Sequence, residues 1–264
     1  MLLALTREIS PSIVHCELTH LAREPIDLDA ARAQHREYER ALEDAGSTVI
    51  RLATAPDMPD AVFIEDAAIV FDELAIVTRP GAESRRRETP AVADALRSHR
   101  PLNFIDAPGT VDGGDVLVVG RRVYVGRSGR TNDAGIARMR AILEPAGYDV
   151  AGVDVTGCLH LKSAVAAVGE GLLLINPQWV SRTVFTGCEF VDIDPAERSA
   201  ANALRIRDVV IYPTSFPKTA ERLTRRGVRL RMVDVSELAK AEGAVTCCSL
   251  VFAARMTADS GSAV

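Results

Sequence analysis

The feature that most constrains this chain is a repeat of hairpin-like segments. Each segment has two β-rich runs around a polar or Gly-rich turn, which is the pattern that β-hairpins require. The turns follow one another at intervals of about 48, 49 and 38 residues. The four segments are 67–81, 115–129, 164–178 and 203–215.

A helical pattern and then a short strand follow most of these hairpins. Helices are predicted over 131–147 and 217–227, each before a short β-rich run. The start of the chain, with a strand at 2–6 and a helix near 28–45, is a partial copy of the same unit. The last β-rich run, 246–252, would supply the strand that this copy lacks. The two ends of the chain are therefore predicted to complete one unit together.

Recurrence of this unit about five times predicts radial closure, because each copy alone leaves an apolar face uncovered. We expect an α/β fold, specifically a five-bladed α/β propeller with pseudo-fivefold symmetry around a central channel. A doubly wound α/β sheet is the alternative, but its strands would alternate singly with helices. One catalytic domain is expected over 1–254, with a flexible C-terminal tail at 255–264.

Composition narrows the class of protein. The chain has 264 residues, 47% of them hydrophobic, and a formal net charge of −5. Its basic runs are short and no apolar run approaches the roughly 18 residues of a membrane span, so neither nucleic acid nor membrane is an expected partner. We expect a cytoplasmic protein whose five cysteines are reduced thiols. Their odd number, without CxxC spacing, argues against a disulfide framework or a structural zinc finger.

Two adjacent cysteines stand in the last β-rich run. If 246–252 is a strand, successive side chains point to opposite faces. Cys248 would then share an apolar face with Thr246 and Phe252 and fill the core. Cys247 would point the other way and could face a site. Most strand cysteines are buried and inert, so Cys247 alone is weak evidence for a nucleophile.

A cysteine nucleophile needs a base, and the base needs a group that orients it. His160, at the start of a hairpin, is the candidate base, although a lone histidine in this position is usually structural. Asp112 and Asp115 flank Gly113-Gly114 in the preceding repeat. Both acids could be turn formers, or one of them could hold the imidazole of the next repeat.

Three carboxylates, Asp60, Glu65 and Asp66, stand just before a buried strand. They could belong to a solvated turn. However, a pair of acids at the mouth of an apolar strand is costly without a cationic partner. A cationic substrate could be that partner.

Six motifs stand in order between about residues 58 and 250. They are MPDAVFIEDAAIV, TRPGAESRRRE, VDGGDVL, VGRSGRTN, LHLKS and TCCS. Together they resemble the dimethylarginine dimethylaminohydrolase family, which belongs to the guanidino-group-modifying, or pentein, superfamily. The resemblance implies the five-bladed α/β propeller. It also implies hydrolysis of N-omega-methylated arginine (asymmetric dimethylarginine or monomethylarginine) to citrulline and dimethylamine or methylamine, through a covalent Cys thiouronium intermediate.

The resemblance further implies a role for individual residues and no cofactor. Cys247 would be the nucleophile, His160 the general acid and base, and Asp112 the group that orients His160. Arginines would hold the substrate carboxylate, acids would line the guanidinium pocket, a backbone carbonyl would receive the substrate ammonium, and one leucine matches a lid position. These substrate-binding residues are Arg85, Arg130, Asp60, Glu65, Asp66, Ala241 and Leu18.

Arginine deiminase, which releases ammonia from arginine, is the alternative enzyme. Its members typically carry an acid two residues after the catalytic histidine, and this chain has Lys162 there. A lysine cannot accept hydrogen bonds from an unsubstituted guanidinium nitrogen, which leaves room for N-methyl groups. Agmatine deiminase is disfavoured if the two arginines bind a carboxylate, because agmatine has none.

The sequence also bears on two other classes of function, which are binding in ribosome assembly and metal binding. The same fold without the cysteine and histidine can serve as a binding protein in ribosome assembly, but this chain retains both residues. Cys247, His160, Glu65 and Asp66 offer ligands that zinc accepts, which is expected to inhibit rather than to be required. A homodimer is one expected assembly, since propeller rims often dimerise.

Overall fold

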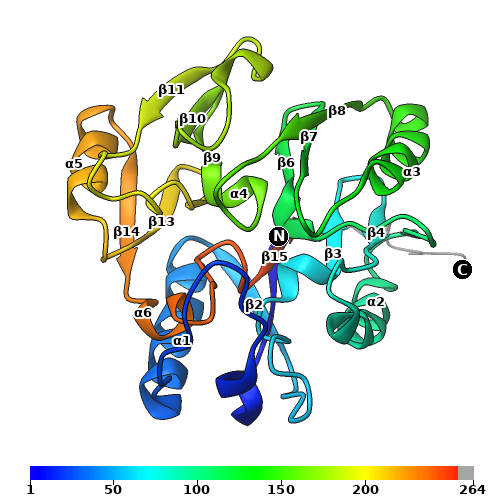
Figure 1. The fold of residues 1–264 in the computed structure, drawn as a ribbon, viewed down its shortest axis with the longest axis horizontal. Coiled ribbons are helices and arrows are strands. Elements are labelled where there is room, and N and C mark those ends of the chain that lie inside the picture. Colours follow the sequence, from blue (N-terminus) through cyan, green and yellow to red (C-terminus); the bar gives the residue numbers. More distant parts are fainter. Residues whose placement is uncertain (255–264) are drawn as a thin grey trace, which may run out of the picture.

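The computed structural model describes residues 1–254, so the predicted tail, 255–264, lies outside the described residues. The chain forms a mixed α/β fold with five three-stranded sheets. Each sheet contains one antiparallel strand pair and one further strand that runs parallel to the middle strand. Figure 1 shows one unit after another on moving around the view.

The four predicted hairpins are confirmed. The first unit of this kind contains β3 (Ala68–Val70), β4 (Ala75–Val77), α2 (Thr89–Leu96) and β5 (Leu102–Phe104). The next contains β6 (Val116–Val119), β7 (Arg122–Arg127), α3 (Asp133–Leu143) and β8 (Asp149–Asp154).

The two remaining hairpins follow the same plan. One unit contains β9 (Val165–Gly169), β10 (Leu172–Ile175) and β11 (Glu189–Asp192), with a 3-10 helix, Arg182–Val184, in place of an α-helix. The other contains β12 (Leu204–Ile206), β13 (Val209–Pro213), α5 (Pro217–Arg225) and β14 (Arg229–Val233).

The fifth sheet joins the two ends of the described chain, as predicted. It is built from β1 (Leu2–Arg7), β2 (Ser47–Leu52) and β15 (Leu250–Ala253), with α1 (Leu28–Asp44) between the first two strands. β15 pairs antiparallel with β1. In Figure 1 the red C-terminal strand accordingly lies beside the blue N-terminal one.

The helices begin and pack where local chemistry allows. Asp27 caps α1 by accepting the N–H groups of two first-turn residues, and Asn132 caps α3 by accepting the N–H of Gly135 at 2.8 Å. Along α1, Ala31, Tyr38 and Leu42 are fully buried, which places one face of this helix against the core.

The prediction that Cys247 lies in a strand is wrong. Residues 245–248 form a turn, and β15 begins only at Leu250. The Cys247 N–H donates to the Ala244 carbonyl at 3.2 Å, so it bonds within its own turn rather than to a neighbouring strand. Alternation of faces therefore does not apply to the cysteine pair.

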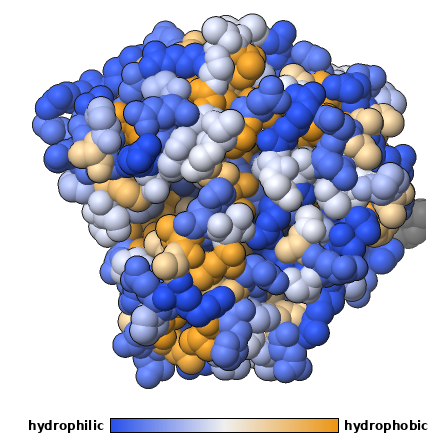
Figure 2. Space-filling model, viewed as in Figure 1, coloured by the Kyte–Doolittle hydropathy of each residue, from blue (hydrophilic) through white to orange (hydrophobic). Residues whose placement is uncertain are grey.

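Hydrophilic side chains cover most of the face seen in Figure 1, and hydrophobic residues gather toward its centre and lower left (Figure 2). Among residues 1–254, no helix is both long and apolar enough to cross a membrane.

Removal of β15 tests how far the fold depends on the joined ends. A chain ending at Ser249 leaves β1 without its antiparallel partner and exposes core contacts of Leu250 and Phe252, so we expect no cooperative thermal unfolding. A chain ending at Ala254 is the control and should melt like the full chain. Circular dichroism melts would measure both, and equal melting of the shorter chain would contradict the dependence.

Candidate active site

One cavity brings together predicted residues that are far apart in the sequence. They come from the first two hairpin units, from the entry to the third and from the segment before β15. The cavity is lined by Asp60, Asp66, Arg85, Arg130, His160, Ala241 and Cys247, with Glu17, Phe63, Leu159 and Glu242 beside them. A thiol, an imidazole and several charged groups therefore share one concave site.

Hydrogen bonds from Glu65 and Tyr38 hold the turn that carries Cys247. The Glu65 N–H donates to the Cys247 carbonyl at 3.1 Å. The buried Tyr38 hydroxyl, on α1, lies 2.7 Å from both the Val245 carbonyl and the Ser249 hydroxyl. Cys248 has 0% exposure and packs in the core, whereas Cys247 is partly exposed. The expected division between a core cysteine and a cavity cysteine thus appears, although a turn produces it.

The predicted placement of Thr246 on the apolar face of Cys248 is wrong. The Thr246 hydroxyl donates to the Glu65 carboxylate at 2.8 Å and accepts a hydrogen bond from the Asn202 side chain at 2.9 Å. In a turn the side chains of neighbouring residues diverge irregularly, so Thr246 points toward the polar side.

His160 lies between two carboxylates. Its Nε2 is 3.1 Å from Asp112, and its Nδ1 is 4.0 Å from Asp66. It stands directly before the short helix α4 (Leu161–Ala164), whose first N–H donates to Asp115 at 2.9 Å. The two acids of the DGGD motif therefore make different contacts. Asp112 contacts the His160 ring, and Asp115 binds the backbone N–H of the next residue.

The two glycines of this motif allow that close approach. A Cβ on Gly114 would lie 2.5 Å from the His160 ring and 3.0 Å from Asp66. A Cβ on Gly113 would lie 1.9 Å from the Glu65 carbonyl oxygen. Only a residue without a side chain fits at either position.

Arg85 is buried between two carboxylates, with which it forms ion pairs. It donates to Asp66 at 2.6 Å and to Glu88 at 2.9 Å, and its Nη2 also reaches the Phe63 carbonyl at 3.0 Å. It was expected to hold a substrate carboxylate. In the structure its guanidinium nitrogens all bond to groups of the protein, although Arg85 is one of the residues that line the cavity.

Glu65 turns away from the cavity of Cys247. Its carboxylate accepts from Lys162 at 2.5 Å and from Thr246. The sequence suggested a cationic substrate as partner for the three acids, but the protein supplies cations for two of them. Glu65 has Lys162, and Asp66 has Arg85.

Asp60 is the acid with the least internal charge compensation. It accepts the Glu17 N–H at 3.2 Å, and burial raises its pKa despite the nearby Arg85. Arg130 bonds the Thr19 hydroxyl at 3.1 Å and lies 3.8 Å from Asp112. These two residues leave one anionic and one cationic group facing the cavity.

Of the two remaining predicted residues, Ala241 lines the cavity of Cys247 and Leu18 does not. Leu18 is partly buried and packs against the core cluster that also contains Ala241. Ala241 lines the cavity, and its N–H donates to the Leu238 carbonyl at 3.0 Å, at the end of α6 (Ser236–Ala239).

Charge around His160 favours its protonated form. Burial by itself lowers the pKa of His160, but the negative charge of Asp66 and the hydrogen bond to Asp112 outweigh burial and raise this pKa to about 9. The imidazole is therefore cationic at neutral pH, and it can donate a proton.

Charge around Cys247 favours the neutral thiol. Burial raises the pKa of Cys247 to about 12, and the carboxylates of Glu65 and Asp66 contribute in the same direction. A thiolate therefore needs an additional positive charge in the cavity.

The metal-ligand set predicted from the sequence differs from the set that the structure brings together. Asp66, Asp112 and His160 place one ligand atom each within 4.8 Å of one another. Cys247 and Glu65, two members of the predicted set, do not belong to this group among residues 1–254. Inhibition by zinc stays a prediction.

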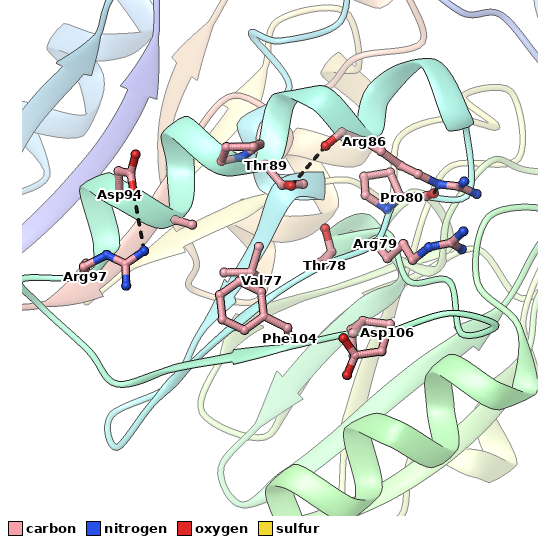
Figure 3. Close-up of a pocket in the computed structure, with 13 residues that line it drawn as sticks. Val77, Thr78, Arg79, Pro80, Arg86, Thr89, Asp94, Arg97, Phe104 and Asp106 are labelled. Atoms are coloured by element: carbon pink, nitrogen blue, oxygen red, sulfur yellow. Dashed lines mark hydrogen bonds and ion pairs between the residues drawn. The ribbon is translucent and has the colours of Figure 1, made fainter.

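A second cavity lies between α2 and the strands β4 and β5 (Figure 3). Figure 3 shows Arg79 and Arg86 pointing the same way at one end, and Arg97 beside Asp94 at the other. Among the described residues that line it there is no cysteine or histidine. This second cavity therefore offers neither the thiol nor the imidazole that line the cavity of Cys247.

Sequence reasoning missed several supporting residues. Glu88 is the final residue of SRRRE, and it holds Arg85. Tyr38 lies in the helical run HREYERAL, where its buried hydroxyl was not distinguishable from a solvent-facing one. Thr246 is the first residue of the motif TCCS but was given no role in the site, and Glu242 lies outside all six motifs.

The raised pKa of His160 predicts a pH dependence of stability. An unfolded histidine titrates near about 6.5, so the ion pairs contribute fully below this pH and are lost as pH rises through about 9. Urea unfolding at pH 6.5 and 9.5 should show a loss of stability in the wild type. The loss should be smaller in His160→Gln, and equal losses in both proteins would contradict the assignment.

Tyr38→Phe should destabilise the chain by about 1–3 kcal/mol, because it leaves the buried Val245 carbonyl without its donor. Tyr124→Phe is a matched control, since the buried Tyr124 hydroxyl has no hydrogen-bond partner within residues 1–254. Urea unfolding would measure both variants. Equal effects would mean that the Tyr38 contact does not hold the cysteine turn.

Known proteins are similar to this chain in sequence and in fold. Residues 20–250 match the family model described as N,N dimethylarginine dimethylhydrolase, eukaryotic. The N(G),N(G)-dimethylarginine dimethylaminohydrolase of Streptomyces coelicolor is 42% identical over 94% of this chain and 95% of its own length. That of Pseudomonas aeruginosa is 39% identical over 86% of this chain and 90% of its own length.

Solved structures agree with this relationship. A Pseudomonas aeruginosa structure, a cysteine-to-serine mutant complexed with citrulline, has a TM-score of 0.90 at 37% identity and covers 94% of this chain and 98% of its own. The N-terminal domain of the cyanobacterial arginine dihydrolase ArgZ has a TM-score of 0.85 at 19% identity, covers 95% of this chain and 97% of its own, and shares the fold. This chain therefore belongs to the dimethylarginine dimethylaminohydrolase family.

Proposed function

We propose that this chain hydrolyses N-omega-methylated arginine to citrulline and dimethylamine or methylamine. The observation that carries the proposal is one cavity in which a buried imidazole, held by two carboxylates, shares the lining with the Cys247 thiol. The likeness to dimethylarginine dimethylaminohydrolases over most of the chain supports the same reaction. The enzyme is a hydrolase that acts on the C–N bond of a linear amidine.

Cys247 is the nucleophile in this proposal. The guanidinium carbon is a poor electrophile, so the attack needs a thiolate. In the free protein, burial and the carboxylates of Glu65 and Asp66 raise the pKa of Cys247 to about 12. A bound guanidinium cation adds the positive charge that favours ionisation. The S–C bond formed in the attack gives a tetrahedral adduct.

His160 then acts as general acid and later as general base. In its protonated form it gives a proton to the leaving amine, the C–N bond breaks, and a thiouronium intermediate stays on Cys247. The neutral imidazole next takes a proton from water, which attacks the same carbon. The adduct then loses the thiolate and its remaining hydroxyl proton, which gives citrulline and restores the Cys247 thiol. Asp112 keeps the ring oriented and stabilises its cationic form, which its 3.1 Å contact allows.

The charges facing the cavity suit the two ends of an arginine-like substrate. Asp60 and Asp66 are placed to accept hydrogen bonds from the guanidinium nitrogens. Arg130 is placed to bind the substrate carboxylate, helped by the part of Arg85 that faces the cavity. The Ala241 carbonyl would accept from the substrate ammonium, while Leu18 packs against the core cluster that contains Ala241 and Glu65 acts beside Cys247 through its ion pair.

Lys162 favours methylated arginine over arginine. Its ammonium lies 2.5 Å from the Glu65 carboxylate. Because this ion pair occupies Glu65, there is no free carboxylate among residues 1–254 at that side of the thiol. An unsubstituted guanidinium nitrogen would lack an acceptor there, whereas a methylated nitrogen needs none. Hydrolysis of arginine itself, as in a deiminase, is the second candidate function.

We also propose that the five sheets are the blades of an α/β propeller with pseudo-fivefold symmetry. Five units of one plan, and a sheet made from both ends of the described chain, support this arrangement. A single domain over 1–254, a cytoplasmic location and a homodimer belong to the same proposal. Within the described chain the five cysteines are unpaired, which suits a reducing compartment.

A citrulline assay tests the function. Purified protein is incubated separately with asymmetric dimethylarginine, symmetric dimethylarginine and arginine. We expect citrulline from the asymmetric compound and little from arginine, because Lys162 leaves no acceptor for a second unsubstituted nitrogen. Citrulline from arginine at a similar rate would move the enzyme to the deiminase class.

The adjacent cysteines supply matched variants for this assay. Cys247→Ser should abolish citrulline formation while the circular dichroism spectrum stays unchanged. Cys248→Ser should keep turnover, since Cys248 packs in the core. Loss of turnover in both folded variants would overturn the assignment of the nucleophile.

A further inference from the structure

Residues 17–21, here called the mouth segment, connect the rim of the cavity to three of its lining residues. The Glu17 N–H donates to Asp60 at 3.2 Å, and the Thr19 hydroxyl accepts from Arg130 at 3.1 Å. Glu242 makes the third connection. All three partners line the cavity of Cys247.

The contact with Glu242 is the most extensive of the three. Its carboxylate accepts N–H groups from three consecutive residues, Thr19, His20 and Leu21, at 2.5 to 3.0 Å. Successive backbone N–H groups that converge on one anion form an anion-binding concavity, and hydrogen bonds to a charged acceptor are the stronger kind. This side chain therefore fixes the backbone of more than half of the mouth segment.

Burial holds the mouth segment less firmly. Leu21 is 51% exposed, and Thr19 and His20 are exposed as well. Leu18 alone packs against the core, and only in part. Without the carboxylate of Glu242, three neighbouring N–H groups would turn to water, and the segment would keep only its contacts near Asp60 and Arg130.

The backbone at Glu242 is itself unusual. Its φ is 57°, in the left-handed region that residues other than glycine rarely adopt. The next residue, Gly243, packs so closely that a Cβ there would lie 2.1 Å from the Phe63 ring. Such backbone strain persists only where the surroundings impose it, and it is concentrated at functional sites.

We propose that Glu242 is a positioning residue that holds the mouth segment across the cavity of Cys247. Through this segment it fixes Glu17 on Asp60 and Thr19 on Arg130, the two groups that face opposite ends of the substrate. The kinetic part of this inference rests on the proposed function. Because Glu242 acts on binding groups rather than on the thiol or the imidazole, its loss should raise KM more than it lowers kcat.

Two measurements test the position of the mouth segment without any substrate. Native-state trypsin cleavage after Arg23, which bonds the carbonyls of Val14 and Cys16, reports opening of the neighbouring backbone. Alkylation of Cys247 by a bulky maleimide, followed by peptide mass spectrometry, reports access to the thiol. Glu242→Ala should speed both by about tenfold or more.

Glu197→Ala is the matched control. Glu197 also holds two consecutive backbone N–H groups, at 2.9 and 2.8 Å, but it does so at the start of α5 and outside the cavity. It should change neither rate. If Glu242→Ala fails to fold, Glu242→Gln carries the test, because its neutral amide oxygen is a weaker acceptor and should give a smaller increase in both rates.

Kinetics complete the test. With the methylated arginine that the wild type hydrolyses, Glu242→Ala should raise KM about tenfold and keep kcat within about threefold. Unchanged cleavage and alkylation in a folded Glu242→Ala variant would overturn the inference. If the wild type hydrolyses no guanidine, the proposed function fails, while the two substrate-free measurements still decide the role of Glu242.

Discussion

A buried line of alternating charges underlies the rest of the site. It runs from Glu88 through Arg85 and Asp66 to His160, and it ends at Asp112. Removing one member would leave its neighbour as an uncompensated buried charge, which is far more costly than the pair is favourable. The line therefore fixes the imidazole in position and in its cationic state. It also explains why Arg85 is held so tightly for a residue at a substrate cavity.

The same charges set opposite conditions for the acid and the nucleophile. The carboxylate of Asp66 raises the pKa of both His160 and Cys247, so the free protein holds a cationic imidazole and a neutral thiol. In the proposed reaction, His160 is therefore a proton donor before the substrate binds, whereas ionisation of Cys247 depends on the positive charge of the substrate. Reaction with other electrophiles is restrained in the meantime.

The periodic parts of the chain were predictable and the aperiodic parts were not. Hairpins, helices and the pairing of both ends follow from alternating and helical patterns that repeat along the sequence. The turn of Cys247 was read as a strand because TCCSLVF is rich in β-formers, while Tyr38, which holds it as a turn, lies on a distant helix. Pairing of Glu65 with Lys162 likewise joins residues far apart in sequence. Such contacts exist only once the units have closed.

The sheet that contains β1, β2 and β15 can be completed only late in translation. β1 leaves the ribosome before every other strand of the described chain, but its antiparallel partner β15 is the last of them to be translated. Cys247, the proposed nucleophile, lies just before β15, so its thiol and the last strand of the fifth sheet are synthesised together. Earlier units can pack while the chain grows, yet a nascent chain contains the imidazole and the acids without the sulfur. The proposed nucleophile and the strand that completes the fifth sheet therefore become available to the folding chain together.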